Sequence, residues 1–234
     1  MNTKDIAEIF TNTLKDRFLK DGYDLSVSTD WFRIGAVLSK NGKKSHNKFR
    51  LLVEHLSDEK IILSYDIHIS FIEIEKILRP ILKKNELSGT DYDEVSDSFR
   101  VKNDLPSEKG IKIASEKDIV LVSDLFTKFF REDALPFFEH WHSLPVLYDY
   151  IKELPEEREV LGEVLGLFYQ LKKAIIYRLC NDNSALEYIE KYYKRRKTIF
   201  ENYPNEIVAE RYYNASKELK ETLEKTAPIY NTVM

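Results

Sequence analysis

The chain has 234 residues, of which 43% are hydrophobic and 32% are charged, a balance typical of a folded protein rather than a disordered one. Its formal net charge of −4 gives no global electrostatic attraction to nucleic acid or to an anionic membrane. The single cysteine, Cys180, excludes an intramolecular disulfide and a cysteine-based zinc cluster, and it is typical of a reducing compartment.

The amino-terminal residues carry scattered charges and lack the apolar core of a signal peptide. No run of the sequence approaches the roughly 18 apolar residues that a membrane-spanning helix needs. We therefore expect a cytoplasmic protein without a membrane partner.

The first third of the sequence predicts a helix followed by an antiparallel sheet. Residues 3–20 carry apolar side chains at helical spacing, and Gly22 is expected to end that helix. Three segments then alternate between apolar and polar residues, as strands with one buried face do: 32–38, 49–53 and 61–70. Asn41-Gly42 is typical of a turn between the first two of these strands.

The third segment, IILSYDIHIS at 61–70, separates into an apolar face and a polar face. Pairing it with the preceding strand so that apolar residues stay together places Asp66 and His68 near Arg50 and Glu54. An Asp–His pair can perform acid–base or metal-dependent hydrolytic chemistry, so Asp66, His68 and Glu54 are the catalytic candidates. The alternative, which we favour because no G-x-S-x-G motif is present, is the solvated face of an ordinary antiparallel sheet.

The segment after these strands is less regular. Residues 71–85 predict a helix that is interrupted or bent at Pro80. The acidic stretch 86–97 is expected to form a surface loop, and two short strands are predicted at 98–103 and 110–115.

From Ser115 onward the pattern predicts helices alone. Capping boxes are expected at Ser115 with Asp118 and at Ser184 with Glu187. The segment 156–179 is expected to be one helix, in which two glycines, Gly162 and Gly166, allow close packing. A final helix at 205–225 has a predicted buried seam: Val208, Tyr212, Ala215, Leu219 and Leu223.

The predicted fold class is therefore α+β, with an amino-terminal antiparallel sheet that has helices on one face and an all-helical carboxy-terminal half built of helical hairpins. We place the boundary near residue 115, giving a sheet region at 1–115 and a helical region at 116–234. The two regions are expected to pack as one continuous unit.

Glu139, His140 and His142 stand within four residues and suggest metal ligands. On a helix, side chains at i and i+2 point about 200° apart, so the two histidines would not face one metal ion. We interpret the segment as the end of one helix and the start of the next at Ser143. No metal ion or other cofactor is predicted.

Two basic segments suggest nucleic-acid binding. The loop at 40–50 has five basic residues, and the run at 190–197 mixes bases with tyrosines. A hairpin tip is ordinarily charged, however, and bases are favoured in the last turns of a helix. We expect that neither segment binds nucleic acid.

The helical half is rich in tyrosine, a residue enriched at protein interfaces. The predicted binding residues are Tyr188, Tyr192, Tyr193, Tyr212 and Tyr213. Adjacent tyrosines on a helix point about 100° apart, so we expect one member of each Tyr-Tyr pair to be exposed.

The leading prediction is a non-enzymatic protein-binding module with another protein as partner; its oligomeric state is left open. The alternatives are a hydrolase or metal-dependent enzyme that uses the Asp66/His68 face, and nucleic-acid binding through loop 40–50.

The segments ALPFFE at 134–139 and ALEY at 185–188 resemble helices of a bacterial α+β family of unknown function. The likeness extends loosely over residues 1–70 and more closely over residues 118–195, and it is absent from the acidic stretch 86–97 and from the last helix. It implies an accessory or toxin-immunity-like protein. It transfers no catalytic residues, because the matching positions are packing residues.

Overall fold

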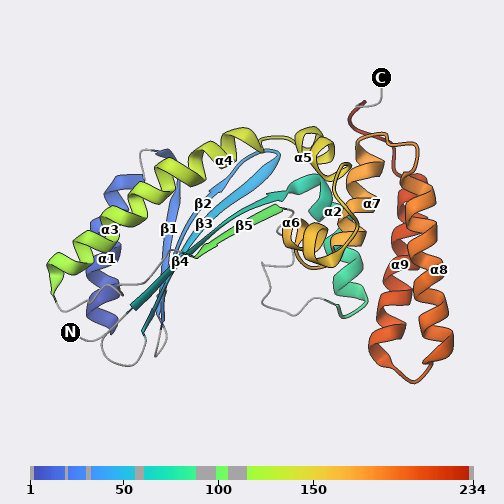
Figure 1. Cartoon of the computed structure of the whole chain (residues 1–234), viewed down its shortest axis with the longest axis horizontal. Helices are drawn as coiled ribbons and strands as arrows, with labels where there is room; N and C mark the ends of the chain where they lie inside the picture. The colour runs from blue at the N-terminus through green and yellow to red at the C-terminus, as the bar shows by residue number, and fades with distance from the viewer. Residues whose placement is uncertain are drawn as a thin grey trace. The chain divides into compact units, whose positions relative to one another are not determined.

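The computed structural model of the chain describes residues 3–18, 21–29, 33–55, 61–87, 99–104 and 115–231. An antiparallel sheet is followed by helices, which confirms the predicted α+β class (Figure 1). The internal contacts divide the chain into two compact units. Unit 1 contains Met1–Ile69 and Arg100–His140, and unit 2 contains Ser70–Phe99 and Trp141–Met234.

The sheet runs in chain order through its strands, each beside the next. The strands are β1 (Asp24–Thr29), β2 (Arg33–Asn41), β3 (Ser45–His55), β4 (Ile61–Phe71) and β5 (Phe99–Asp104). β1 pairs with β2, and β2 with β3, in antiparallel register, with Leu38 opposite Phe49. The turn at Asn41-Gly42 is confirmed, since the Gly42 amide donates to the Ser45 carbonyl at 2.8 Å. β1 was not predicted, because the short segment DLSVST has only two apolar residues, Leu25 and Val27. Both are half-buried.

One face of this sheet forms the core of unit 1. Strict alternation brings the buried residues of three strands to that face: Ala36, Leu38, Phe49, Leu51, Tyr65, Ile67 and Ile69. Helices α1 (Thr3–Phe18) and α3 (Glu116–Phe129) supply the aromatic rings that pack there. Phe126 of α3 lies 5.0 Å from Phe49 and 5.7 Å from Phe18, measured between ring centroids. The prediction of helices on one face is confirmed for these elements.

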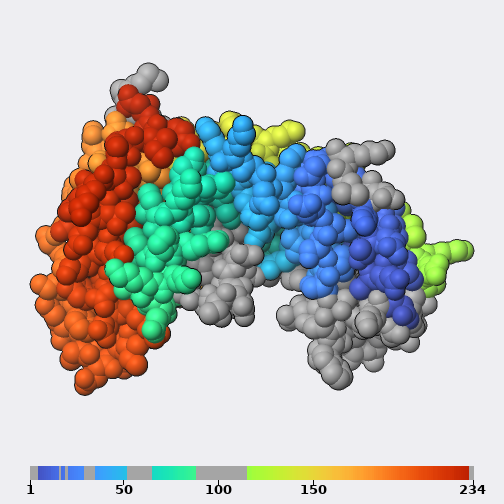
Figure 2. Space-filling model, turned by 180° about the vertical axis from the view of Figure 1, so that it is seen from behind, coloured from blue at the N-terminus to red at the C-terminus, as the bar shows by residue number. Residues whose placement is uncertain are grey.

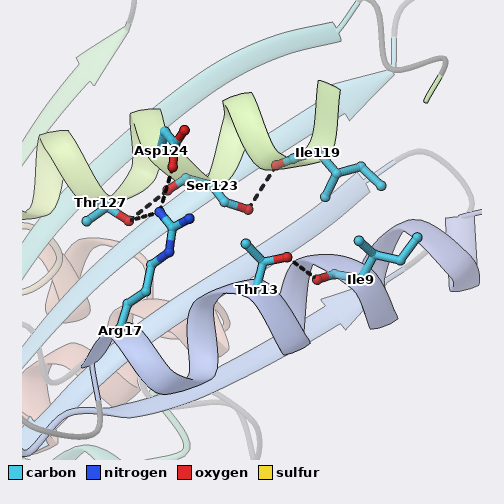
Figure 3. A network of polar contacts seen from close by, with 7 residues as sticks. All are labelled: Ile9, Thr13, Arg17, Ile119, Ser123, Asp124 and Thr127. Carbon is cyan, nitrogen blue, oxygen red and sulfur yellow. Dashed lines mark hydrogen bonds and ion pairs between the residues drawn. The ribbon is translucent and has the colours of Figure 1, made fainter. Parts of the chain in front are cut away.

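A polar contact joins α1 to α3 at the rim of this core (Figure 3). Arg17 Nη1 donates to Asp124 Oδ1 at 2.7 Å and to Thr127 Oγ1 at 3.1 Å. The hydroxyl groups of Thr13 in α1 and Ser123 in α3 each donate a hydrogen bond to the carbonyl four residues earlier. Neither hydroxyl is therefore left unsatisfied between the helices. Arg17 thus fixes the position of one helix relative to the other.

The helical run at 116–140 belongs to unit 1. After α3 the run widens into a π-helical turn, η3 (Phe130–Ala134), and continues as α4 (Leu135–His140). Phe130 is fully buried, and the centroid of its ring lies 4.9 Å from that of the Tyr23 ring. The sequence-based boundary near residue 115 grouped these helices with the helical half. They pack with the sheet instead, because the aromatic rings of Phe126 and Phe130 contact Phe49 on its apolar face.

Unit 2 consists largely of helices. They are α2 (Ile72–Lys84), α5 (Leu144–Ile151), η4 (Arg158–Gly162), α6 (Glu163–Leu165), α7 (Tyr169–Leu179), α8 (Ala185–Asn202) and α9 (Ile207–Lys225). α2 runs through Pro80 as one helix and lies along α9, as Figure 2 shows in green and red. Lys84 and Asn85 at its end both contact Glu218, at 3.1 Å and 3.2 Å.

The prediction of one helix over 156–179 is wrong. Gly166 adopts φ 66° and ψ −148°, and Phe168 is left-handed with φ 59°, so the chain reverses before α7 begins. Lys172 is fully buried and donates from Nζ to the Leu165 carbonyl at 2.7 Å, which satisfies the end of α6. Gly166 therefore ends a helix rather than permitting close packing.

Other local predictions have mixed outcomes. The capping box at Ser115 with Asp118 is confirmed. Ser184 does not form the second one, since its amide and hydroxyl both donate to Asp182 Oδ1. The predicted strand at 98–103 is observed as β5. The strand expected at 110–115 and most of the acidic loop at 86–97 lie outside the described residues. Among the helices that the structure describes, none is both long enough and apolar enough to cross a membrane.

Candidate functional site

The first candidate site is on the sheet, where Arg50 of β3 meets Asp66 and His68 of β4. Arg50 donates to both carboxylate oxygens of Asp66, from Nη2 at 2.6 Å and from Nε at 3.0 Å. His68 Nε2 lies 2.6 Å from Asp66 Oδ1. The predicted association of these three residues is therefore observed.

The expectation that this face is solvated is wrong. Asp66 is 8% exposed, His68 5% and Ser70 4%. Burial opposes ionisation of Asp66, but hydrogen bonds from His68 and Arg50 outweigh it and hold the pKa of the carboxyl below its ordinary value. A buried carboxylate persists only with such partners, so Asp66 is an interior charge held by Arg50 and His68.

The other predicted ligands and catalytic groups have different outcomes. Glu54 lies in β3, but its side chain is outside the described residues. Within the described ranges, no group of three or more His, Cys, Asp or Glu side chains could hold a metal ion. His140 ends α4 and His142 precedes α5, whose N-cap is Ser143, as the interpretation of a helix end and a new start predicted.

The second candidate site is in unit 2, on α8. Tyr188 and Tyr192 line an open depression of about 200 Å³ together with Lys191 and Arg195 of the same helix. These four positions, i, i+3, i+4 and i+7, form one helical face. Glu156, in the turn before η4, and Gln170 of α7 complete the wall.

Hydrogen bonding and charge organise this depression. The Tyr188 hydroxyl donates to Glu156 Oε1, and burial together with this carboxylate raises the pKa of Tyr188. The ammonium group of Lys173, a residue only 6% exposed, lies 5.4 Å from the Tyr188 ring and 5.3 Å from the Tyr177 ring. This geometry is a cation–π contact that places positive charge behind the tyrosine wall.

Two donors of the depression are uncommitted. Arg195 and Gln170 make no side-chain hydrogen bond or ion pair with any residue that the structure describes. Lys191, by contrast, pairs with Glu187 at 2.6 Å. The site therefore offers one guanidinium and one amide to a ligand, beside two phenol rings.

The remaining predicted tyrosines lie inside the α8–α9 hairpin. Tyr213 stacks between Phe200, at 5.2 Å, and Tyr193, at 5.8 Å. Tyr212 lies under the guanidinium of Arg196 at 4.5 Å. Tyr192 is buried and the other four predicted tyrosines are half-buried, so neither Tyr-Tyr pair has a fully exposed member. Tyr193, Tyr212 and Tyr213 are thus engaged in holding the hairpin together.

An apolar patch lies at the turn of the same hairpin. Tyr203, Ile207 and Val208 are 61%, 63% and 58% exposed, within six residues of one another. The predicted buried seam is observed at Ala215, Leu219 and Leu223, but the prediction for Val208 is wrong. α9 begins at Ile207, so its first turn extends beyond the part of the helix that is covered. We name Tyr203, Ile207 and Val208 the hairpin tip.

The basic loop 40–50 does not form a single basic patch. Lys40 donates to the Asp21 carbonyl at 2.9 Å and lies over the Tyr23 ring, while Arg50 is bound to Asp66. Lys43 and Lys44 are exposed at the turn. Two of the five bases of this loop, Lys40 and Arg50, are therefore engaged at different places in unit 1.

The sequence analysis considered Lys191 and Arg195 only as part of the basic run at 190–197, without connecting them to Tyr188, and it missed Gln170 and Glu156. The first two could have been found, because their spacing from Tyr188 places them on its helical face. Gln170 and Glu156 belong to other segments, and no pattern in the sequence predicts that they lie next to α8.

Comparisons with known proteins add no relative. No protein-family model matches the chain, and neither the curated proteins nor the solved structures contain a match. The class that can be stated is that of the fold, an α+β protein. The resemblance of ALPFFE and ALEY to a bacterial family remains a prediction.

Proposed function

We propose that this protein is a non-enzymatic protein-binding module, of the adaptor or immunity kind, that binds another protein through the tip of the α8–α9 hairpin. The observation that carries the proposal is the exposure of Tyr203, Ile207 and Val208, each more than half accessible. Neighbouring large apolar side chains exposed to this degree are typical of interaction surfaces.

The charges around the hairpin tip indicate the chemistry of the partner. Glu206 and Glu210 are exposed beside it, and the exposed Glu201 pairs with Lys197 at 3.6 Å. An acidic rim disfavours an anionic membrane and favours an apolar protein surface with basic residues around it. The stacked rings of Tyr193, Tyr213 and Phe200 hold the hairpin rigid, which reduces the entropy lost on binding.

A photo-crosslinking amino acid at position 207 tests the proposal in lysate of the source organism. Position 167 is the matched control, because Leu167 is 59% exposed but lies in the turn before α7. We expect one crosslinked protein from position 207 and none of it from position 167. The purified partner should bind a variant carrying Ile207→Ser and Val208→Ser at least about tenfold more weakly, as one lost apolar anchor implies.

Three outcomes contradict the proposal. They are the absence of a specific crosslink from position 207, a crosslink formed only between two copies of this chain, and unchanged partner affinity in the tip variant. Circular dichroism of the tip variant must show the wild-type unfolding midpoint, since exposed positions contribute little to stability.

A second candidate function is general acid–base chemistry at His68. It is favoured by the 2.6 Å contact between His68 Nε2 and Asp66 Oδ1, because a carboxylate that orients an imidazole is a recurrent catalytic arrangement. It requires a substrate path to a residue that is 5% exposed. Absence of hydrolysis of activated esters, or equal hydrolysis by wild type and His68→Gln, would remove this candidate.

A further inference from the structure

The depression on α8 is distinct from the hairpin tip. Arg195 is the lining residue of α8 nearest the tip, and it precedes Tyr203, the C-cap of α8, by eight residues, about 12 Å along the helix at 1.5 Å per residue. A ligand held between Tyr188, Tyr192 and Arg195 does not cover the tip. Nothing in the tip is needed to form the depression.

Charge indicates what the depression binds. Its lining residues carry two cations, Lys191 and Arg195, and one anion, Glu156, and therefore a net charge of +1. Lys191 already has Glu187 as a partner, which leaves Arg195 as the uncommitted cation. A singly charged anion matches this one uncommitted cation, whereas a dianionic phosphate would bring an excess negative charge close to the Glu156 carboxylate.

Shape and donor geometry narrow the ligand further. A planar guanidinium binds a carboxylate through two parallel hydrogen bonds, and the Gln170 amide supplies a further donor from α7. The volume of about 200 Å³ is below the range of about 300–1,000 Å³ typical of small-molecule pockets. It suits a chain end or one side chain rather than a nucleotide. The rings of Tyr188 and Tyr192 provide an amphipathic surface for the atoms beside the carboxylate.

We propose that this depression binds a peptide carboxylate, with Arg195 and Gln170 as its donors and Tyr188 and Tyr192 as its walls. The carboxylate is either the carboxy-terminal group of a polypeptide or the side chain of an Asp or Glu within one. The inference rests on the proposed protein-binding function, because it assigns the carboxylate to a partner protein.

Titrations followed by NMR test the inference with three short N-acetylated peptides. The first, acetyl-Gly-Gly-Phe, has a free carboxy terminus; the second is its carboxy-terminal amide; the third is acetyl-Gly-Glu-Phe amide. We expect at least one of the two carboxylate peptides to shift the side-chain signals of Arg195 and Gln170 saturably, and the uncharged amide to shift neither. The peptide that binds more tightly identifies the source of the carboxylate.

Variants assign the binding to the named donors. Arg195→Gln should weaken the preferred peptide about tenfold, as expected for loss of a charge-assisted pair, and Arg195→Lys should restore part of it. Lys217→Gln is the control, because it removes an exposed cation from α9 outside the depression. Any of three outcomes would overturn the inference: no saturable shift from either carboxylate peptide, equal binding of the uncharged amide, or an equal effect of Arg195→Gln and Lys217→Gln. Because the peptides do not require the hairpin tip, failure here and failure of the crosslinking experiment are separate results.

Discussion

Arg50 of β3 binds Asp66 of β4 through both oxygens of the carboxylate, with Nη2 2.6 Å from Oδ2 and Nε 3.0 Å from Oδ1. The Asp66 side chain is 11% exposed and that of Arg50 29%. The carboxylate is thus an interior charge, and its ionised form depends on Arg50 and His68. This dependence makes the cluster a measurable contributor to stability.

Asp66→Asn should destabilise the protein in a pH-dependent manner. The folded pKa of Asp66 lies below its unfolded value, so its contribution is fully present above about pH 4 and is lost as the pH falls through the folded pKa. We expect Asp66→Asn to lower the free energy of unfolding by about 2–3 kcal/mol at pH 6.5 and by less at pH 3. The value at pH 6.5 is below the range of about 3–5 kcal/mol for breaking a fully buried ion pair, because Arg50 is partly exposed. Urea unfolding at both pH values measures the difference.

The control for this prediction is Glu163→Gln, which neutralises an exposed carboxylate in α6. Its effect on the free energy of unfolding should be small at both pH values. A loss in Asp66→Asn that stays constant between pH 6.5 and pH 3 would show that the ionised carboxylate is not what stabilises the cluster.

Cys180 should be unreactive in the folded protein. Its side chain is fully buried, and burial together with Asp149 and Asp182 raises the pKa of the thiol to about 12. The thiolate fraction at pH 8 is then on the order of one in ten thousand. Ellman's reagent should modify the thiol only in denaturant. Rapid stoichiometric labelling of the native protein would contradict this prediction.

Gly166→Ala should cost about 1–3 kcal/mol, because φ 66° with ψ −148° is a backbone region essentially restricted to glycine. Gly162→Ala is the matched control four residues earlier. There the backbone is helical, and a Cβ would lie 3.4 Å from Arg158 Cγ, an ordinary contact. Its free energy of unfolding should change by less than about 1 kcal/mol. Equal effects of the two substitutions in urea unfolding would disprove the helix-ending role of Gly166.

Leu219→Ala and Val208→Ala should differ sharply although both residues belong to the same predicted seam of α9. Leu219 is fully buried, so truncation should cost about 2–5 kcal/mol through lost burial and a residual cavity. Val208 is 58% exposed, and its truncation should change the free energy of unfolding by less than about 0.5 kcal/mol. A large loss in Val208→Ala would mean that the hairpin tip is covered in the folded protein.

The loop at 40–50 should not bind nucleic acid near physiological salt. Four phosphate contacts would give a slope of log K against log salt of about −3 to −4. Lys40 and Arg50 are engaged within unit 1, and the net charge of −4 repels a polyanion. A labelled oligonucleotide at two salt concentrations checks this. Salt-sensitive binding that is lost on Lys43→Ala with Lys44→Ala would contradict the prediction.

The sequence determined the features that depend on neighbours along the chain. Alternation in β2, β3 and β4 placed one apolar face correctly, since side chains in a strand change sides at every residue. Helical spacing and the Ser115–Asp118 capping box located α3, and Pro204 lies just after the end of α8, where a proline stops a helix. These signals are local, and the backbone obeys them wherever the segment packs.

Tertiary structure decided which faces are covered and which residues meet. The alternation in β4 cannot show that Asp66 and His68 are buried as deeply as the apolar residues beside them, because it separates the two faces of a strand without showing what covers either face. The seam of α9 likewise continues in the sequence through Val208, although the covered part of the helix stops short of it. Arg195 meets Gln170 and Glu156 only because α7, α8 and the turn before η4 converge. Periodicity tells which side chains share a face, whereas burial and binding depend on what the rest of the chain brings to that face.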